Sequence, residues 1–206
     1  MATTLTTDRL LLRPVRDSDL ETAYAINNDP EVMRYLNGGR PVPLERVRDK
    51  DLPRMTRHHP AIGGPAYWAA EDRSTGRLLG WFLLRPVREG DSSLLELGYR
   101  LGRDAWGRGL ATEGSRALIR RAFTELGAER VTANTMTVNA GSRRVMEKCG
   151  LRLLRTHFDK WPQAIEGSEH GDVEYVLDRA DWADPSGRTD PADPADPTDE
   201  PDRPTG

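Results

Sequence analysis

Hydrophobic positions follow two different periods along this chain. Short apolar or alternating runs predict strands, and positions that recur every three to four residues predict helices. The predicted strands are Arg9–Val15, 66–72, 77–87, Ser93–Leu101, Arg130–Val138, 151–159 and 172–182. The predicted helices begin near Ser18, Pro43, Leu110 and Asn139.

Local signals predict where these helices begin and end. Ser18 followed by Glu21 fits a capping box, and Pro30 is expected to end that first helix. The helix from Pro43 is expected to be broken because Pro53 lies inside it. Gly127 is predicted to cap the third helix, and a fourth runs between an Asn139 cap and Gly150.

The order of these elements predicts an α/β fold built on one mixed sheet. Strands and helices alternate in the centre of the chain, which favours parallel pairing there. Hairpins at both ends favour antiparallel pairing, with the sequence RSTG as the turn between the second and third strands. We therefore expect a mostly antiparallel sheet of about seven strands with a parallel centre and helices on both faces.

The composition divides the chain into a body and a tail. From Asp184 the sequence repeats Asp-Pro with almost no apolar residue, so residues 184–206 are predicted to be disordered. Seven acids and two arginines give this segment a charge of −5, which leaves about +2 for residues 1–183 out of a total of −3. We expect residues 1–183 to form one domain whose slight positive charge suits a small anionic ligand.

Several functional classes are disfavoured by what the sequence lacks. No signal peptide and no apolar run long enough to cross a bilayer is evident, so we expect a cytoplasmic protein without a membrane role. The single cysteine, Cys149, cannot form an internal disulfide. His157, Asp159 and His170 lack metal-ligand spacing, which predicts no metal. No basic stripe with interleaved aromatics predicts a nucleic-acid partner.

The run WGRGLATEG (Trp106–Gly114) places glycines directly before a helix. Unpaired amides and the helix dipole make such a turn an anion site, although a tight turn without a ligand is an equally good interpretation. A nucleotide P-loop would need Gly-Lys-Ser/Thr, which is missing. A dinucleotide fingerprint would need glycine or alanine where Thr112 stands.

Two motifs together resemble the GNAT superfamily of N-acetyltransferases, and more narrowly its branch of ribosomal-protein N-terminal acetyltransferases. In the phosphate-loop pattern Gln/Arg-x-x-Gly-x-Gly/Ala, Gly109 and Ala111 match, and Trp106 takes the first position. One strand later, a second motif matches at Asn139, Ser142, Glu147, Lys148, Gly150 and Leu151. The resemblance covers roughly residues 7–182.

The resemblance implies acetyl-CoA as co-substrate and assigns its binding residues. The loop amides would hold the pyrophosphate, and they belong to Gly107, Arg108, Gly109, Leu110, Ala111 and Thr112. The backbone of Tyr99, Arg100 and Leu101 would pair with the pantetheine arm, and one of its amides would polarise the thioester carbonyl. Asn139 would contact the pantetheine region, while an N-cap role needs no ligand.

The resemblance also points to candidates for the acid and the base. The family's usual tyrosine position holds Met146, so Ser142 is the candidate acid, unless it only bonds locally within its helix. Glu96 lies near the position of a common catalytic glutamate, on the face opposite Leu95 and Leu97. Its other interpretation is a glutamate paired with an arginine such as Arg100.

The function implied is transfer of acetyl to a primary amine by direct attack in a ternary complex. The first acceptor is a protein or peptide N-terminal α-amine, and the second is a small-molecule amine such as an antibiotic or metabolite. A domain that binds acyl-CoA without turnover is the alternative of another class, since Met146 removes the usual acid. The resemblance leaves a monomer and a homodimer open, and residues 30–65 and 157–171 would set acceptor specificity without any motif.

Overall fold

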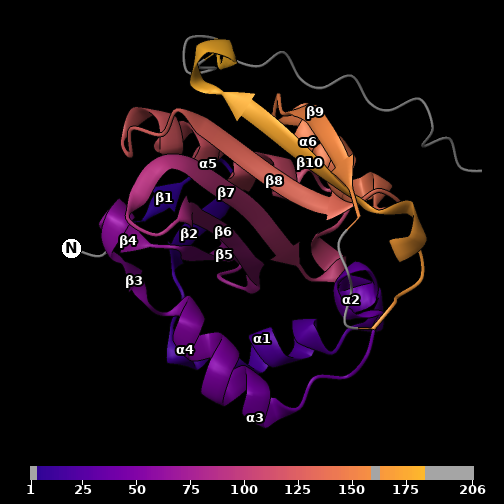
Figure 1. Ribbon diagram of the computed structural model, residues 1–206. Coiled ribbons are helices and arrows are strands. Elements are labelled where there is room, and N and C mark those ends of the chain that lie inside the picture. The colour runs from indigo at the N-terminus through magenta and orange to yellow at the C-terminus, as the bar shows by residue number, and fades with distance from the viewer. Residues whose placement is uncertain (1–3, 159–162, 184–206) are drawn as a thin grey trace, which may run out of the picture.

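A single eight-stranded sheet organises the chain in the computed structural model, which describes residues 4–158 and 163–183 (Figure 1). Its order is β1-β2-β5-β6-β7-β8-β10-β9. The strands are β1 (Leu5–Thr6), β2 (Leu10–Pro14), β5 (Tyr67–Asp72), β6 (Leu78–Arg88), β7 (Asp91–Leu101), β8 (Arg130–Met136), β9 (Arg152–His157) and β10 (Asp172–Asp178). Only β7 and β8 pair in parallel, so the predicted mixed sheet with a parallel centre is confirmed.

Helices cover both faces of this sheet, as predicted. On one side lie α1 (Leu20–Asn27), α2 (Pro30–Asn37), α3 (Leu44–Arg46) and α4 (Leu52–Met55), below the sheet in Figure 1. The other face is packed by α5 (Leu110–Thr124) and α6 (Ala140–Lys148). A separate short pair, β3 (His58–His59) and β4 (Gly64–Pro65), precedes β5.

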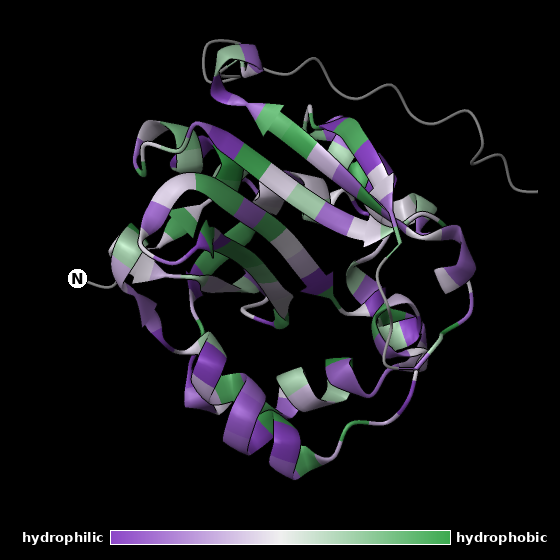
Figure 2. Cartoon of the chain, in the orientation of Figure 1, coloured by the Kyte–Doolittle hydropathy of each residue, from purple (hydrophilic) through white to green (hydrophobic). Residues whose placement is uncertain are grey.

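Two hydrophobic clusters follow from side-chain alternation on the strands. Trp68 and Phe82 face the α5 side and belong to the larger cluster, whereas Ala69 and Trp81 face α1 and α4. The contact of α5 with the sheet is very close at Gly114, where a Cβ would lie 2.3 Å from Phe82 Cζ. Glycine is therefore required there for α5 to approach β6. In Figure 2 hydrophobic residues are frequent along the central strands, while the outer turns of α3 and α4 are mainly hydrophilic.

The capping box predicted at Ser18 is wrong. A short 3-10 turn, Asp17–Asp19, precedes α1, and the Asp19 carboxylate accepts the Arg16 amide at 2.8 Å. The same carboxylate receives both Nη atoms of buried Arg13 at 2.8 Å. Burial alone would raise the pKa of Asp19, but these bonds outweigh it and lower that pKa. The Asp19 carboxylate therefore both pairs with the buried arginine and caps this turn.

The region between Pro30 and Pro65 differs most from expectation. Helix α1 ends before Pro30, as expected, but Pro30 also begins a second helix, α2. The N-cap of α2, Asp29, accepts the amides of Glu31 and Val32. The helix predicted to break at Pro53 runs from α3 to α4 through a π-helical turn, Val47–Asp51. The wider turn accommodates the proline without ending the helix.

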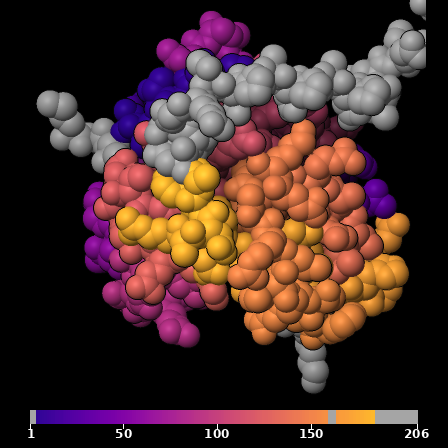
Figure 3. Space-filling view, turned by 90° about the horizontal axis from the view of Figure 1, so that it is seen from above, coloured from indigo at the N-terminus to yellow at the C-terminus, as the bar shows by residue number. Residues whose placement is uncertain are grey.

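Strand β9 forms one edge of the sheet and leaves most of its side chains exposed. Residues of α6 and β9 form a broad part of the surface in Figure 3 (orange). The predicted tail, residues 184–206, lies outside the described part of the chain, so the domain boundary at 183 stays a prediction.

Candidate active site

The central feature of the site is an opening between β7 and β8. The two strands pair only at Leu94–Arg130, Leu95–Val131 and Glu96–Thr132. Both then continue, β7 to Leu101 and β8 to Met136, with no further pairs recorded between them. The sheet therefore presents an unpaired strand edge at its centre, a geometry that can accept an extended ligand as an added strand.

Backbone groups of β7 point into this opening. The Gly102 amide donates to the Leu79 carbonyl of β6 at 2.8 Å. Because hydrogen-bonding direction alternates along an antiparallel strand, the groups of Tyr99 and Leu101 face the other way, toward the opening. The Trp106 indole donates to the Leu101 carbonyl at 2.9 Å and so ties the following loop to this edge. By the same alternation the backbone of Arg100 faces β6, so Arg100 can serve the opening only through its side chain.

The glycine loop lies where β7 leads into α5. Gly107 and Gly109 have φ of +70° and +73°, which few other residues adopt. Gly109 is the N-cap of α5 and provides no side-chain acceptor, so amides in the first turn from Leu110 remain for a ligand. The helix dipole adds partial positive charge at the same place. The arrangement is an anion site formed mainly by backbone.

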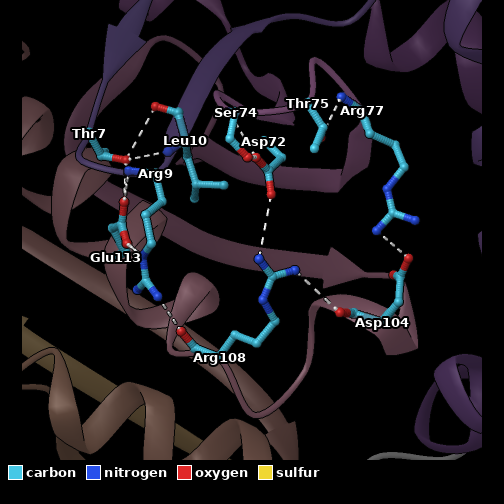
Figure 4. Close-up of polar contacts among 10 residues, drawn as sticks. All are labelled: Thr7, Arg9, Leu10, Asp72, Ser74, Thr75, Arg77, Asp104, Arg108 and Glu113. Atoms are coloured by element: carbon cyan, nitrogen blue, oxygen red, sulfur yellow. Dashed lines mark hydrogen bonds and ion pairs between the residues drawn. The ribbon is translucent and has the colours of Figure 1, made fainter.

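Side chains far away in the sequence hold this loop in place (Figure 4). Arg9 donates from Nη1 to the Arg108 carbonyl at 2.7 Å and from Nε to Glu113 at 2.7 Å. Glu113 also accepts from the Thr7 hydroxyl at 2.6 Å and from the Arg9 amide at 2.8 Å. Strand β2 and its preceding turn are thereby fixed to the first turn of α5.

The Arg108 guanidinium is held loosely beside the loop. Its contacts to Asp72 Oδ2 and to the Asp104 carbonyl are both 3.5 Å long. The Asp72 carboxylate accepts hydrogen bonds mainly from Ser74, and these hydrogen bonds lower the pKa of Asp72. In Figure 4 the Arg108 guanidinium lies between Asp72 and Asp104. A half-exposed arginine with such long contacts can turn toward an anion on the loop.

Ser142 and Tyr99 meet on the helix face of the opening. Their hydroxyl oxygens are 2.8 Å apart, and Tyr99 can also donate to the Ser142 carbonyl at 3.0 Å. Asn139 caps α6, because its Oδ1 accepts the Ser142 amide at 3.1 Å while its Nδ2 donates to Thr135 at 3.0 Å. Burial raises the pKa of Tyr99, so its hydroxyl stays protonated at neutral pH.

Two further residues, one on α6 and one next to its end, lie in the core. Met146 is 3% exposed and packs in the larger hydrophobic cluster. Cys149 is also buried, and burial raises the pKa of its thiol to about 12. Cys149 is therefore a packed thiol at neutral pH and not a nucleophile.

Glu96 lies at the point where β7 and β8 separate. Its predicted face is confirmed, because Leu95 and Leu97 are buried on the α5 side. The expected partner Arg100 is wrong: Arg85 donates from Nε at 2.8 Å and approaches from Nη2 at 2.7 Å, both to Glu96 Oε2. Arg85 is the cross-strand neighbour of Glu96 on β6, which places the two side chains together.

Sequence reasoning missed the loop supports and the Tyr99 hydroxyl. Arg9 and Glu113 are 104 residues apart, and no local pattern connects them. Strand alternation places Tyr99 on the face opposite Glu96, but no pattern in the sequence indicates that its hydroxyl contacts Ser142 of α6. Within residues 4–158 and 163–183, no group of three or more potential metal ligands occurs, and no helix is long and apolar enough to span a membrane.

Comparisons with known proteins agree with this geometry. A family model described as "Acetyltransferase (GNAT) domain" matches residues 9–152. An Aspergillus fumigatus protein named "FsC-acetyl coenzyme A-N(2)-transacetylase" is 35% identical over 185 residues, which are 87% of this chain and 77% of that protein.

Solved structures share the fold at low identity. A spermidine N-acetyltransferase from Vibrio cholerae, in complex with CoA and spermine, superimposes with a TM-score of 0.67 at 18% identity. A ribosomal L7/L12 alpha-N-protein acetyltransferase in complex with coenzyme A gives 0.70 at 14% identity. Each comparison covers 85% of this chain and 98% of the other, and likeness at this identity speaks for the fold alone.

Proposed function

This chain belongs to the GNAT acetyltransferase family, and from that premise we propose that it acetylates an α-amine with residues described above. Family membership makes it an N-acetyltransferase that uses acetyl-CoA as co-substrate. A domain that only binds acyl-CoA is thereby disfavoured, because the named relatives are transferases. The observation that carries the site assignment is the unpaired edge of β7 beside the glycine loop.

The coenzyme would lie along that edge and end at the loop. Amides from Gly107 to Thr112 would bind the pyrophosphate, and the loosely held Arg108 side chain would turn toward it. The pantetheine arm would pair with the backbone of Tyr99 and the amide of Leu101, which face the opening. One of their amides would then donate to the thioester oxygen as negative charge develops there. Asn139, already the cap of α6, would border the arm.

Ser142 is our candidate for the acid. In the reaction the amine nitrogen attacks the thioester carbon, the C–N bond forms and the C–S bond breaks. The departing thiolate needs a proton, and Ser142 faces the opening with a hydroxyl partner in Tyr99. When Tyr99 donates to Ser142 Oγ, the Ser142 proton is free to bond to the sulfur. Tyr99 would thus act as the positioning residue.

Glu96 is our candidate for the base. It lies where the opening begins and would receive the amine proton through a water molecule. At pH 7 an α-amine with a pKa of about 8 loses its proton for ~1.4 kcal/mol, whereas a lysine at about 10.4 requires ~4.6 kcal/mol. A half-buried carboxylate already bonded to Arg85 suits the smaller demand.

The relatives' names support the same acceptor class. The Aspergillus fumigatus protein is named for an N(2) position, which is how the α-nitrogen of an amino acid is numbered. The ribosomal enzyme is named for an α-amine of a protein, so this fold is compatible with a peptide N-terminus as the first acceptor. A small-molecule amine is the second candidate, because the same fold occurs in an enzyme named for spermidine.

Mass spectrometry of an acceptor panel tests this function. The purified chain is mixed with acetyl-CoA, peptides with a free α-amine, the same peptides with a blocked α-amine and a lysine, and simple polyamines. We expect mass gain at free α-amines together with release of thiol. Acetylation confined to lysine or polyamine nitrogens would overturn the α-amine assignment.

A further inference from the structure

The side chain of Arg100 lies on the face of β7 opposite α5 and α6. Arg100 pairs in register with Trp81 of β6, and its guanidinium carbon lies 5.2 Å from the centre of the Trp81 ring. Trp81 belongs to the smaller hydrophobic cluster beneath α1 and α4. Arg100 is therefore a cation in a largely apolar layer. This layer includes side chains from residues 30–65, a segment without any sequence motif.

This guanidinium lacks the acidic partner that other arginines of the sheet have. Its Nη1 donates to the amide oxygen of buried Asn27 on α1, a neutral acceptor. Its Nε is buried and has no hydrogen-bond partner. Among the described residues no carboxylate lies within ion-pair distance of it, whereas Arg13 pairs with two carboxylates and Arg85 with one. A buried donor left unpaired is costly, and native structures keep few of them without a reason.

The groups around Arg100 leave this charge only partly balanced. Burial, with a smaller contribution from nearby Arg54, lowers the pKa of Arg100 to about 10, although Asp51 and Tyr67 oppose the change. Asp51 lies between two other arginines, 3.8 Å from Arg46 and 3.9 Å from Arg54. Arg100 therefore remains a cation at neutral pH in a place where an anion would be bound favourably.

The location of Arg100 relative to Glu96 fits an acceptor with two functional groups. Both side chains lie on the same face of β7, four residues apart, or about 13 Å along a strand. Gly98 lies between them, and a Cβ there would come only within 3.5 Å of Leu83, so this stretch of the face is not crowded. An amine over Gly98 could use Glu96 on one side while a second group reached Arg100 on the other.

We propose that the Arg100 guanidinium binds a carboxylate carried by the acceptor close to its reactive amine. This inference rests on the α-amine function proposed above and narrows its acceptor class. The carboxylate has two possible sources: the α-carboxylate of a free amino acid, or an acidic side chain near the N-terminus of a peptide. In either case the Arg100 guanidinium would gain the charged acceptor that it lacks and hold the amine over the β7 opening.

Matched acceptors separate this idea from the function it rests on. The probes are free amino acids with their carboxamides, and peptides with Asp or Asn at the second position. We expect wild-type kcat/KM to favour the carboxylate in at least one pair by about 10- to 100-fold, the range of a charged hydrogen bond. The pair that shows the preference identifies the source. Arg100→Met should bring that ratio close to one, and Arg100→Lys should keep part of it.

Arg88→Met is the matched control, because Arg88 is an exposed arginine at the far end of β6. It should keep the wild-type ratio, and thermal melting should show that all variants fold. A wild-type enzyme that acetylates both members of each pair equally would overturn the carboxylate proposal and leave the α-amine function intact. A loss confined to the KM for acetyl-CoA in Arg100→Met would overturn it too, and would assign Arg100 to the coenzyme site.

Should no acceptor in these pairs react, the α-amine function fails, and binding decides the Arg100 proposal separately. Melting temperatures would then be measured with CoA plus either an N-acetyl amino acid or its carboxamide. Stabilisation by the carboxylate alone, lost in Arg100→Met, would support the site, and equal response to both would reject it.

Discussion

The glycine loop, proposed to bind the coenzyme, and the face proposed to bind the acceptor are built from different parts of the chain. The loop, Trp106–Thr112, offers backbone amides from a few consecutive residues. The acceptor face, where α1 to α4 cover the sheet, offers side chains brought together from distant segments, such as Asn27 and Arg100. A pyrophosphate is the same in every reaction with acetyl-CoA, whereas acceptors differ. Backbone suits the constant ligand, and side chains can change with the variable one.

Ser142 contacts Tyr99 from α6, and its loss is expected to have the largest effect. Ser142→Ala should lower kcat by roughly 10²–10⁴-fold, the range for one general acid, because the thiolate loses its proton donor. Acetyl-CoA affinity should change little, since loop and strand edge stay intact. Steady-state thiol release with a confirmed acceptor measures the first quantity, and calorimetric titration measures the second. Nearly full kcat would show that another group protonates the thiolate.

Tyr99→Phe sharpens that result. It removes only the hydroxyl that contacts Ser142, so kcat should fall less than in Ser142→Ala, and Tyr99→Phe should add little in the Ser142→Ala background. Additive losses in the double variant would show that Tyr99 does not act through Ser142. Met146→Tyr would restore the family's usual tyrosine, but it is not expected to restore the kcat lost in Ser142→Ala. Met146 is packed in the core, and the larger side chain with its hydroxyl would need space there.

The glycine loop is tested by a substitution that strains the backbone and adds a side chain beside the amides. Gly109→Val should weaken coenzyme A binding by at least tenfold, because a β-branched residue resists φ of +73° and its side chain occupies space beside the amides. In the free protein a Cβ at Gly109 would contact only Arg9 Nη2, at 3.5 Å, so the fold should survive.

Gly76 gives the matched control for this strain. It has φ of +69° in the turn between β5 and β6, with nothing near an added Cβ. Gly76→Val should cost similar stability, about 1–2 kcal/mol, and leave coenzyme A affinity unchanged. Equal affinity in a folded Gly109→Val, measured by calorimetry, would refute the loop assignment.

The sequence predicted the parts of the molecule that are encoded locally. Seven strands, the loop and the α6 cap at Asn139 each depend on neighbouring residues, and the structure contains them all. The prediction of a cap at Ser18 was wrong because the Asp19 carboxylate caps this turn instead. Asp19 is held there by buried Arg13, several residues away. The Glu96 partner, the Arg9 support of the loop and the setting of Arg100 could not be predicted for the same reason. Each depends on contacts between separate segments, which no single segment encodes.

Glu113 connects the two kinds of region, because a distant side-chain contact supports the backbone loop. Burial raises the pKa of Glu113, but bonds from Thr7 and Arg9 outweigh this and leave it lowered. A lowered folded-state pKa means that the carboxylate stabilises the fold above its unfolded pKa, near 4.5, and that this stabilisation is lost as the pH falls through the folded value.

Glu113→Gln is therefore expected to have the smallest effect of the series, and one that depends on pH. Between pH 6 and 8 it should remove about 1 kcal/mol, or about 2–4 °C in Tm for a domain of this size, and weaken coenzyme A binding by a few-fold as Arg9 loosens from the Arg108 carbonyl. As the pH falls from 4.5 through the lowered folded-state pKa, the stabilisation by the carboxylate is lost, so the difference in Tm should shrink toward zero. Melting curves of both proteins from pH 3.5 to 8 measure it. A difference that stayed constant down to pH 3.5 would mean that the shape of Glu113, and not its charge, holds β2 to the loop.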